Sequence, residues 1–436
     1  MKVLALTHAH LDTEGLSPVS CERADSIAGT WAGKLGWEVD VVHTAGTRWR
    51  GIWPNGEGLK INILNIQAPH SYMLGTRPLF TAELKAYLEK RKLAGLASLV
   101  GSRIASRARH TLAVSNLALP ADLAAAGKWG RYIARQPELA GKKYDFIFVC
   151  VGYGDEYLLQ TAHVLSRLLH IPTITDLRDL WSEHHEPARF TDKQRKQVRR
   201  HEVKLLANTA LISVPQKHMK HLLDKWVNKP VYMLSHSAYA DKVWHEGRVT
   251  HNEFIMLYAG KLYAGGPGIK MLLELVKQLA QAQQARPFRC RFFVDDVKKL
   301  QELAADYDIT KYVEANAWIA PGELWTQMRS AHLLVIPDPG VAEHYPVLPT
   351  KTFQYAYTGR QILGLLEFAN PIMQEFLQEH NAGMATTKVS DAVPWVSAMM
   401  SDETLYKELP PLRRMPFREE LAEAYGREIQ GIIAGK

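Results

Sequence analysis

The chain has 436 residues, of which 47% are hydrophobic and 22% charged, a balance that indicates a folded protein of two domains and excludes a disordered one. Its formal net charge of +8 favours anionic partners, and the absence of helix-turn-helix, zinc-finger and RNA-binding motifs argues against nucleic acid. No apolar run approaches the roughly 20 residues of a membrane span, and three scattered cysteines (Cys21, Cys150, Cys290) argue against a disulfide framework, so we expect a cytoplasmic protein.

Strand-like and helix-like segments alternate through the first half of the chain. The predicted strands are 2–6, 39–43, 61–66, 146–151, 173–175 and 210–214, and the predicted helices are 22–35 and 157–169. Short β-rich runs separated by helices indicate a parallel sheet that is covered on both faces.

The alternation restarts after a polar stretch at 241–253. The predicted strands are 254–259, 291–294, a short one at Val313, 333–337 and 362–366, and the predicted helices are 269–284, 300–305, 323–330 and 351–358. We therefore predict a Rossmann-like domain over 1–238, a linker at 239–252 and a second Rossmann-like domain over 253–412. A last helical segment at 413–436 is expected to cross back to the first domain.

A segment at about 70–140 interrupts the first domain and is predicted to be a basic helical insertion. Between Lys85 and Arg109 it carries seven basic residues and one acid, interleaved with leucines. Such a helix can lie in the interface of an anionic membrane, on its inner, cytoplasmic face. The alternative is an insertion whose apolar face packs on its own domain.

Open parallel sheets bind ligands at the carboxyl ends of their strands, so the loops after the predicted strands are the first places to look for a site. The loop after 254–259 contains Gly260 and Lys261, followed by Gly265, Gly266 and Gly268 before the next helix. Glycines allow close approach of the backbone, and a helix N-terminus offers free N–H groups to a diphosphate. The plainer interpretation is a glycine turn into a helix.

Two further loops carry polar clusters. Pro349 opens a helix on which Thr350, Lys351 and Gln354 lie within one turn, at another N-terminus suited to anions. After strand 173–175, Asp176 and Asp179 flank Arg178 next to Trp181. These groups either line a cleft between the domains or form an Arg–Asp pair that fixes the loop.

Six motifs occur in order along nearly the whole chain. Two lie in the first third: ERA at 22–24, on a predicted helix that is followed by GWEV at 36–39, and the spaced set Pro120, Asp122 and Trp129. The other four are DLRDLW at 176–181, YAGKL at 258–262, PTKTFQY at 349–355 and TGRQIL at 358–363. In this order they resemble the motifs of retaining glycosyltransferases of family 4, in particular the bacterial polysaccharide branch. The resemblance implies the α/β fold named GT-B, with two Rossmann-like domains whose parallel sheets face each other across a cleft.

The resemblance also implies roles for individual residues. Lys261 follows the YAG motif and would hold the donor phosphates, and Gln354 stands where the family has the glutamate that binds the ribose. The implied donor-binding set is Gly260, Lys261, Gly265, Gly266, Gly268, Pro349, Thr350, Lys351 and Gln354. The implied acceptor side comprises Gly15, Asp155, Asp176 and Arg178, and the implied catalytic residues are Lys261, Asp155 and Arg178.

The expected function is transfer of a sugar from a nucleotide-diphosphate sugar to a hydroxyl of a glycan or lipid-linked acceptor, as in the synthesis of bacterial polysaccharides or glycoconjugates. No cofactor and no metal are expected. Pairs such as His8 and His10 have no further ligands at the spacing of a zinc site, and Gly152 and Gly154 lack the third glycine of a dinucleotide-binding motif.

Two alternatives stay open because the chain departs from the family pattern. Pro346 and Gln354 stand in place of the family's spaced glutamate pair, and Asp295 and Asp296 replace a glycine pair. A non-catalytic, sugar-nucleotide-binding scaffold protein would tolerate these changes. A GT-B-like sugar-nucleotide epimerase is the second alternative.

Overall fold

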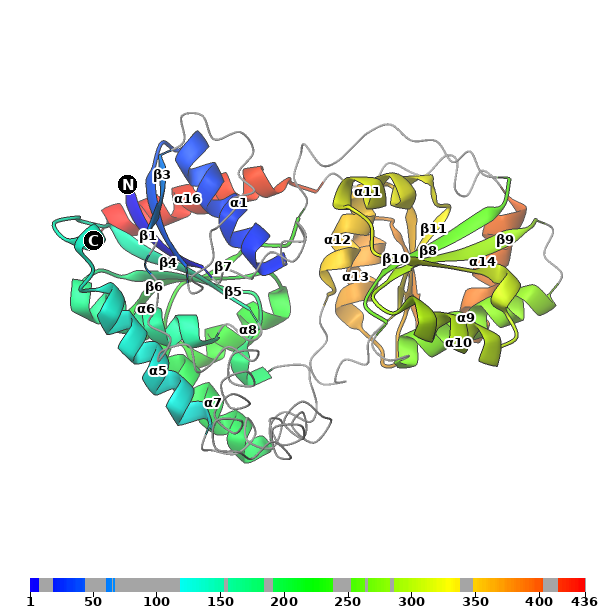
Figure 1. The fold of residues 1–436 in the computed structure, drawn as a ribbon, viewed down its shortest axis with the longest axis horizontal. Coiled ribbons are helices and arrows are strands. Elements are labelled where there is room, and N and C mark those ends of the chain that lie inside the picture. The colour runs from blue at the N-terminus through cyan, green and yellow to red at the C-terminus, as the bar shows by residue number, and fades with distance from the viewer. Residues whose placement is uncertain are drawn as a thin grey trace, which may run out of the picture. The chain divides into compact units, whose positions relative to one another are not determined.

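The computed structural model describes residues 1–7, 19–43, 60–64, 66, 118–152, 156–183, 191–237, 252–262, 266–282, 286–337, 348–402 and 415–435. They form two compact units (Figure 1). Unit 1 holds the described residues of 1–235 and 419–435, and unit 2 holds those of 236–418. Each unit is an α/β layer structure with one parallel sheet between helices.

The sheet of unit 1 has seven strands in the order β3-β2-β1-β4-β5-β6-β7, and every neighbouring pair is parallel. Its strands are β1 (Lys2–Thr7), β2 (Glu38–His43), β3 (Ile61–Leu64), β4 (Phe146–Val151), β5 (Thr173–Leu177), β6 (Thr209–Val214) and β7 (Val231–Met233). Central strands β4, β5 and β6 are buried along their whole length, as expected for a sheet covered on both faces.

The helices of unit 1 are α1 (Val19–Lys34), α5 (Ala118–Ile133), α6 (Glu156–Leu169), α7 (Asp192–Leu205), α8 (Lys217–Trp226) and α16 (Arg418–Ala434), with 3₁₀ turns η2 (Pro137–Leu139), η3 (Trp181–Glu183) and η4 (Leu206–Asn208). Helix α16, from the C-terminal end of the chain, packs on α1. The indole N–H of Trp31 donates to the carbonyl of Ala422 at 2.9 Å, and the Tyr425 ring stacks on Tyr232 at 5.2 Å. Unit 1 therefore contains both ends of the described chain.

The sheet of unit 2 has six parallel strands in the order β10-β9-β8-β11-β12-β13. Its strands are β8 (Phe254–Gly260), β9 (Phe288–Val294), β10 (Val313–Ala317), β11 (Leu333–Pro337), β12 (Gln361–Leu365) and β13 (Gly383–Thr386). Its helices are α9 (Pro267–Gln281), α10 (Val297–Asp306), α11 (Pro321–Ser330), α12 (Thr350–Tyr357), α13 (Pro371–Glu379) and α14 (Val389–Ser401), with the 3₁₀ turn η6 (Thr310–Tyr312).

Two hydrophobic clusters cover the faces of the second sheet. Alternate residues of β8, such as Met256 and Tyr258, join the cluster formed with α9, α10 and α14. The residues between them, such as Leu257, join the cluster formed with α11, α12 and α13. This alternation follows from the period of two along a strand, and it holds α9 and α12 on opposite faces of the sheet.

The predicted strands and helices that fall on described residues occur, and two strands, 146–151 and 333–337, have the predicted bounds. The prediction of β9 is three residues short, because Arg289 and Arg291 interrupt the apolar pattern where they pair with Glu253 and Glu314. The predicted basic helix at 85–109 and all of the linker 239–252 except Asn252 lie outside the described residues. Of the predicted insertion, 118–140 is described and contains α5 and η2. No helix in the described part of the chain is long and apolar enough to cross a membrane.

Candidate functional site

The strand order of unit 2 reverses between β8 and β11. From β8 the chain proceeds to β9 and β10 on one side of the sheet and then returns to β11 on the other side. All these strands are parallel, so the loops after β8 and β11 leave the sheet at the same edge and diverge there. Doubly wound folds bind ligands at such switch points. Gly260 is the last residue of β8 and Lys261 follows it, whereas helix α12 is the next described element after β11.

The Lys351 side chain of α12 reaches the end of β8. A Cβ atom built on Gly260 would lie 1.9 Å from its Nζ atom, so the ammonium group occupies the space that a side chain at Gly260 would fill. The same ammonium lies 5.1 Å from the centroid of the Tyr258 ring, within cation–π range. The missing side chain at Gly260 therefore creates the seat of Lys351, which explains why glycine is needed there.

The seat leaves Lys351 desolvated. Burial lowers the pKa of its ammonium to about 8; the positive charge of Lys261 acts in the same direction, and Asp295 opposes both. Within the described residues no carboxylate forms a salt bridge with Lys351. The Asp295 carboxylate instead accepts the N–H of Leu262 at 2.8 Å. Lys351 is a half-buried, desolvated cation, and without a paired carboxylate among the described residues it is suited to a ligand that carries negative charge.

Helix α12 is fastened to β8 by a second tyrosine. The N–H of Ala259 donates to the hydroxyl of Tyr355 at 3.1 Å, and Tyr355 is fully buried. Thr352 is also fully buried, and its Oγ1 has no hydrogen-bond partner in the described structure. These contacts hold the first turn of α12, with Pro349 at its N-cap and Gln354 half-buried one turn later, at the carboxyl end of β8.

The remaining donor-site residues lie where the glycine-rich loop enters α9. Gly266 is the N-cap of α9, Pro267 fills its first turn and Gly268 is buried. Gly266 has no side chain that could cap this helix, so its first N–H groups and the positive end of its dipole are left uncapped by the N-cap residue. Lys261 is exposed, and its backbone carbonyl accepts the hydroxyl of Tyr258 at 2.6 Å. Gly265 lies outside the described residues.

Asp176 of unit 1 lies inside a closed hydrogen-bond cluster. Its carboxylate pairs with Arg23 at 2.6 and 3.0 Å and also accepts the hydroxyl of Ser213 at 2.7 Å. Arg23 continues to the carbonyl of Leu234 at 2.6 Å. Burial alone would raise the pKa of Asp176, but the Arg23 guanidinium and the hydrogen bond from the Ser213 hydroxyl keep it below its ordinary value. In this structure the carboxylate ties α1 to β5, β6 and the end of β7.

Arg178 follows Asp176 and lies over Gly152, at the carboxyl ends of β5 and β4. A Cβ built on Gly152 would lie 3.0 Å from one terminal nitrogen of Arg178. The Nε atom is buried and has no hydrogen-bond partner within the described structure. The strand order of unit 1 reverses between β1 and β4, so Arg178 lies one strand away from that switch point. Gly15 and Asp155, the other acceptor-side residues, lie outside the described residues.

Glu202 is a buried acid that the motifs did not indicate. It projects from α7 and accepts the N–H of Trp181 and the hydroxyl of Ser182, both at 2.8 Å. Burial raises its pKa to about 7, against the hydrogen bonds that it accepts. Glu202 therefore positions the backbone that follows Arg178. The only signal in the sequence is that Glu202 is the one acid beyond the first residue, Asp192, of the basic helix DKQRKQVRRHEVKL.

No group of three or more His, Cys, Asp or Glu side chains that could hold a metal ion occurs among the described residues. Glu183, from the acidic and histidine-rich run at 183–186, pairs with Arg199 and lies 3.9 Å from Arg195. Asp296 caps α10 by accepting the N–H of Lys299 at 2.9 Å. These two acids have structural partners.

No protein-family model matches the chain, and no curated protein matches it in sequence. Solved structures do match its fold over its full length. Sucrose-phosphate synthase from Thermosynechococcus elongatus matches with a TM-score of 0.58 at 12% identity, covering 100% of both chains. WaaG, a glycosyltransferase of lipopolysaccharide biosynthesis, matches with a TM-score of 0.56 at 13% identity, again covering 100% of both.

A Listeria monocytogenes protein described as a UDP-N-acetylglucosamine 2-epimerase matches with a TM-score of 0.58 at 10% identity, covering 100% of this chain and 97% of the other. Identities this low establish the architecture alone. The two parallel sheets of seven and six strands, each between helices, match the Rossmann-like domains of these structures. The chain has the GT-B fold.

Proposed function

We propose that this protein is a retaining glycosyltransferase that uses a nucleotide-diphosphate sugar. The observation that carries the proposal is the seat of Lys351: a desolvated cation against Gly260, at the switch point of unit 2. This is where a doubly wound domain binds a nucleotide, and a diphosphate supplies the negative charge that the seat lacks. The GT-B fold shared with WaaG and sucrose-phosphate synthase agrees with this assignment.

The chemistry needs stabilisation of a leaving group rather than a strong base. The bond between the sugar C1 and the diphosphate oxygen breaks, the acceptor oxygen bonds to C1, and the acceptor proton passes to the departing phosphate. Charge therefore develops on the diphosphate in an oxocarbenium-like transition state. Lys351, Lys261 and the free N–H groups at the start of α9 are the groups that would stabilise this charge.

The other residues take supporting roles in the proposal. Gln354 would bind the ribose hydroxyls, because its amide both donates and accepts hydrogen bonds. Arg178, with its unpartnered Nε, would face the acceptor together with Asp155. Asp176 would act through Arg23 by fixing the strand end from which Arg178 projects. No resident metal or cofactor takes part in the proposed reaction.

Calorimetry with UDP, GDP and ADP tests the donor site. Lys351→Ala and Lys261→Ala should each weaken binding of the preferred nucleotide, by about 1.5–3 kcal/mol for a lost hydrogen bond to a charged group. Lys270→Ala is the matched control, because Lys270 is an exposed lysine one turn into α9. Unchanged affinity in both test variants would remove the donor site from unit 2.

Epimerisation is the second candidate, because the match to the protein described as a UDP-N-acetylglucosamine 2-epimerase is as strong as that to sucrose-phosphate synthase. The two reactions differ in their products. A transferase releases nucleoside diphosphate only when an acceptor takes up the sugar, whereas an epimerase changes the sugar nucleotide without an acceptor. A scaffold protein would bind the nucleotide and do neither.

We further propose that the basic segment at 85–109 brings the protein to anionic membranes on their cytoplasmic face. Seven cations against one acid should contribute about 1 kcal/mol each near such a surface and lose this attraction at high salt. Sedimentation with neutral and anionic vesicles is the test. Equal recovery with both, or no effect of reversing the charges of Lys90, Arg91 and Lys92, would contradict the proposal.

A further inference from the structure

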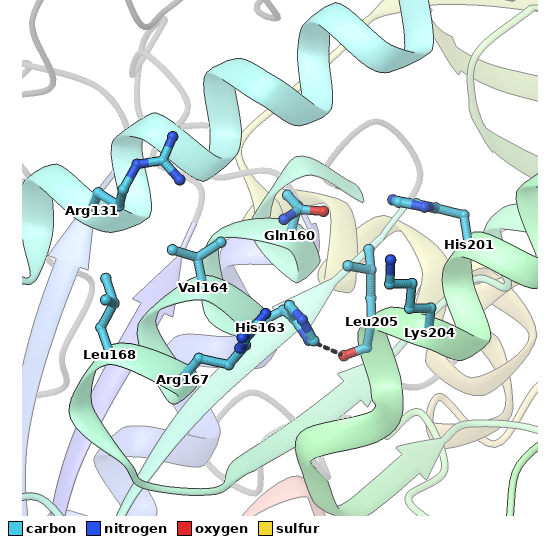
Figure 2. A pocket seen from close by; sticks show the side chains of 9 residues that line it. All are labelled: Arg131, Gln160, His163, Val164, Arg167, Leu168, His201, Lys204 and Leu205. Atoms are coloured by element: carbon cyan, nitrogen blue, oxygen red, sulfur yellow. Dashed lines mark hydrogen bonds between the residues drawn. The ribbon is translucent and has the colours of Figure 1, made fainter.

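A pocket of about 390 Å³ lies between α5, α6 and α7 of unit 1, away from the residues assigned above. Figure 2 shows side chains from these three helices converging on it. The described residues that line it are Arg131, Gln160, His163, Val164, Arg167, Leu168, His201, Lys204 and Leu205. Its volume falls within the range of pockets that bind small molecules.

The pocket lies toward the amino ends of the strands. Arg131, Arg167 and Lys204 each stand in the last turn of their helix, α5, α6 and α7 respectively. In a parallel α/β layer the helices run against the strands, so these last turns lie near the edge of the sheet opposite to the strand ends that carry Arg178. The pocket is therefore separate from the acceptor side proposed above, and it belongs to a different unit from Lys351.

The lining is strongly positive. It contains three permanent cations and two histidines, and no carboxylate among its described residues. None of the three cations forms a salt bridge within the described part of the chain. Their positions offset the negative ends of three helix dipoles, but each dipole end carries only about half a charge, so roughly 1.5 of the three positive charges remain.

The two histidines add hydrogen-bonding groups that can take up a further charge. His163 donates its Nδ1–H to the carbonyl of Leu205 at 3.2 Å, which fixes its tautomer (Figure 2). His201 has a buried Nε2 without a hydrogen-bond partner in the described structure. Burial holds the pKa of each ring below its ordinary value, and the nearby positive charges, Arg167 and Lys204 at His163 and Lys204 at His201, act in the same direction.

The apolar part of the lining limits the size of the occupant. Val164, Leu168 and Leu205 form one wall, and Leu168 is 47% exposed although it is a large hydrophobic residue. A bare ion would leave this wall in water, whereas a small molecule with both an anionic group and an apolar part would cover it. Gln160 offers an amide to such a molecule.

We propose that this pocket binds the phosphate group of a small phosphorylated molecule, at a site separate from the nucleotide-sugar site. Arg131, Arg167 and Lys204 supply the charge, and His163 and His201 lie beside them. The ligand is recognised by its phosphate and a short apolar portion, and the proposal does not depend on glycosyl transfer by unit 2.

The test is calorimetry of the full chain with inorganic pyrophosphate. Lys351→Ala is included in every protein to weaken the proposed donor site, so that a difference between the variants reports on the pocket. We expect Arg167→Ala combined with Lys204→Ala to weaken binding by about 30-fold or more, because charge-assisted hydrogen bonds are the strongest polar contacts. Lys128→Ala is the matched control, because Lys128 is an exposed cation on α5 that does not line the pocket. Both substituted residues are exposed, so the loss of their helix-dipole interactions should lower the melting temperature only slightly.

Unchanged affinity in the double variant, an equal loss in the control, or no pyrophosphate binding at all would overturn the proposal. A parallel measurement with phosphatidylglycerol vesicles separates a lipid headgroup from a soluble ligand. Loss of vesicle binding with pyrophosphate binding retained would also overturn it. If the protein turns out to transfer no sugar but the double variant still loses pyrophosphate, the pocket stands and the proposed function alone fails.

Discussion

Gly260→Ala tests the seat of Lys351 directly. The new Cβ would lie 1.9 Å from the Lys351 Nζ and 2.6 Å from the Tyr258 hydroxyl oxygen. Ordinary contact requires about 3.5 Å, so the ammonium must retreat by roughly 1.5 Å. A lysine end is flexible and can move, so the fold should lose only about 1 kcal/mol of stability, mostly through the shift of Tyr258.

The functional cost follows from the charge. At an effective dielectric constant of about 20, withdrawing a unit charge from about 3 to about 4.5 Å from a phosphate oxygen costs roughly 2 kcal/mol, or about 30-fold in affinity. Calorimetry with the preferred nucleoside diphosphate measures this loss. Gly322→Ala on α11 is the matched control, because a Cβ there meets nothing within 4 Å.

A double-mutant cycle decides whether Gly260 acts through Lys351. In a Lys351→Ala background the added methyl group has no ammonium to displace, so Gly260→Ala should cost little further affinity. Full loss in that background would mean that the glycine contacts the ligand by itself. No loss in the wild-type background would refute the assignment of this seat to the diphosphate.

Three further predictions concern other parts of the chain. Burial raises the pKa of Glu202 to about 7 in the folded protein, against an ordinary 4.5, so up to about 3 kcal/mol of folding stability is lost as the pH rises from 4.5 toward 8. Denaturant unfolding at pH 5 and pH 8 should therefore show a smaller difference in stability for Glu202→Gln than for the wild type. Parallel pH profiles of the two proteins would contradict this. Gln354→Ala should cost roughly 1–3 kcal/mol of donor affinity while Gln354→Glu is tolerated, and gain of activity only in Gln354→Glu would mean a lapsed transferase. Gly426→Ala should lower the melting temperature, because its Cβ would lie 2.4 Å from Leu35 Cδ1 and 2.8 Å from Trp31 Nε1, whereas Gly431→Ala on the same helix meets nothing and should not.

Most of the fold could be predicted because its buried strands carry continuous apolar runs. FIFVCV at 146–151 and LLVIP at 333–337 lie in the middle of their sheets and have no polar face to blur their ends. Edge strands are different. VYM at 231–233 and GMAT at 383–386 are short and half-buried, and the sequence analysis did not predict either of them.

Helix α7 shows a second limit of the sequence pattern. It buries Val198 and Leu205 but also the carboxyl group of Glu202, and most of its other residues are charged. A buried acid occupies one of the positions of α7 that face the protein interior. The apolar residues of α7 therefore do not recur with the period of 3.6 residues that marks an amphipathic helix. Glu202 is satisfied by backbone groups of η3, 20 residues away, and such partners cannot be read from local sequence.

The candidate site could be predicted in outline but not in its geometry. Glycine, lysine and helix-start signals placed Gly260, Lys261 and Lys351 after strands that proved to be parallel neighbours. The motif resemblance assigned the leading role to Lys261, which is exposed, whereas Lys351 is the cation that the fold desolvates. That difference arises from the contact between α12 and β8, which are joined only in the folded chain.

Product analysis by mass spectrometry decides whether the protein transfers a sugar to an acceptor. The full chain is incubated with a panel of UDP-, GDP- and ADP-sugars and with glycan and lipid-linked acceptors, in parallel with Lys351→Ala and Gly322→Ala. We expect a glycosylated acceptor and an equal amount of free nucleoside diphosphate from the wild type and Gly322→Ala, and strongly reduced amounts of both from Lys351→Ala. An altered sugar nucleotide formed without acceptor, or equal product from Lys351→Ala, would contradict it.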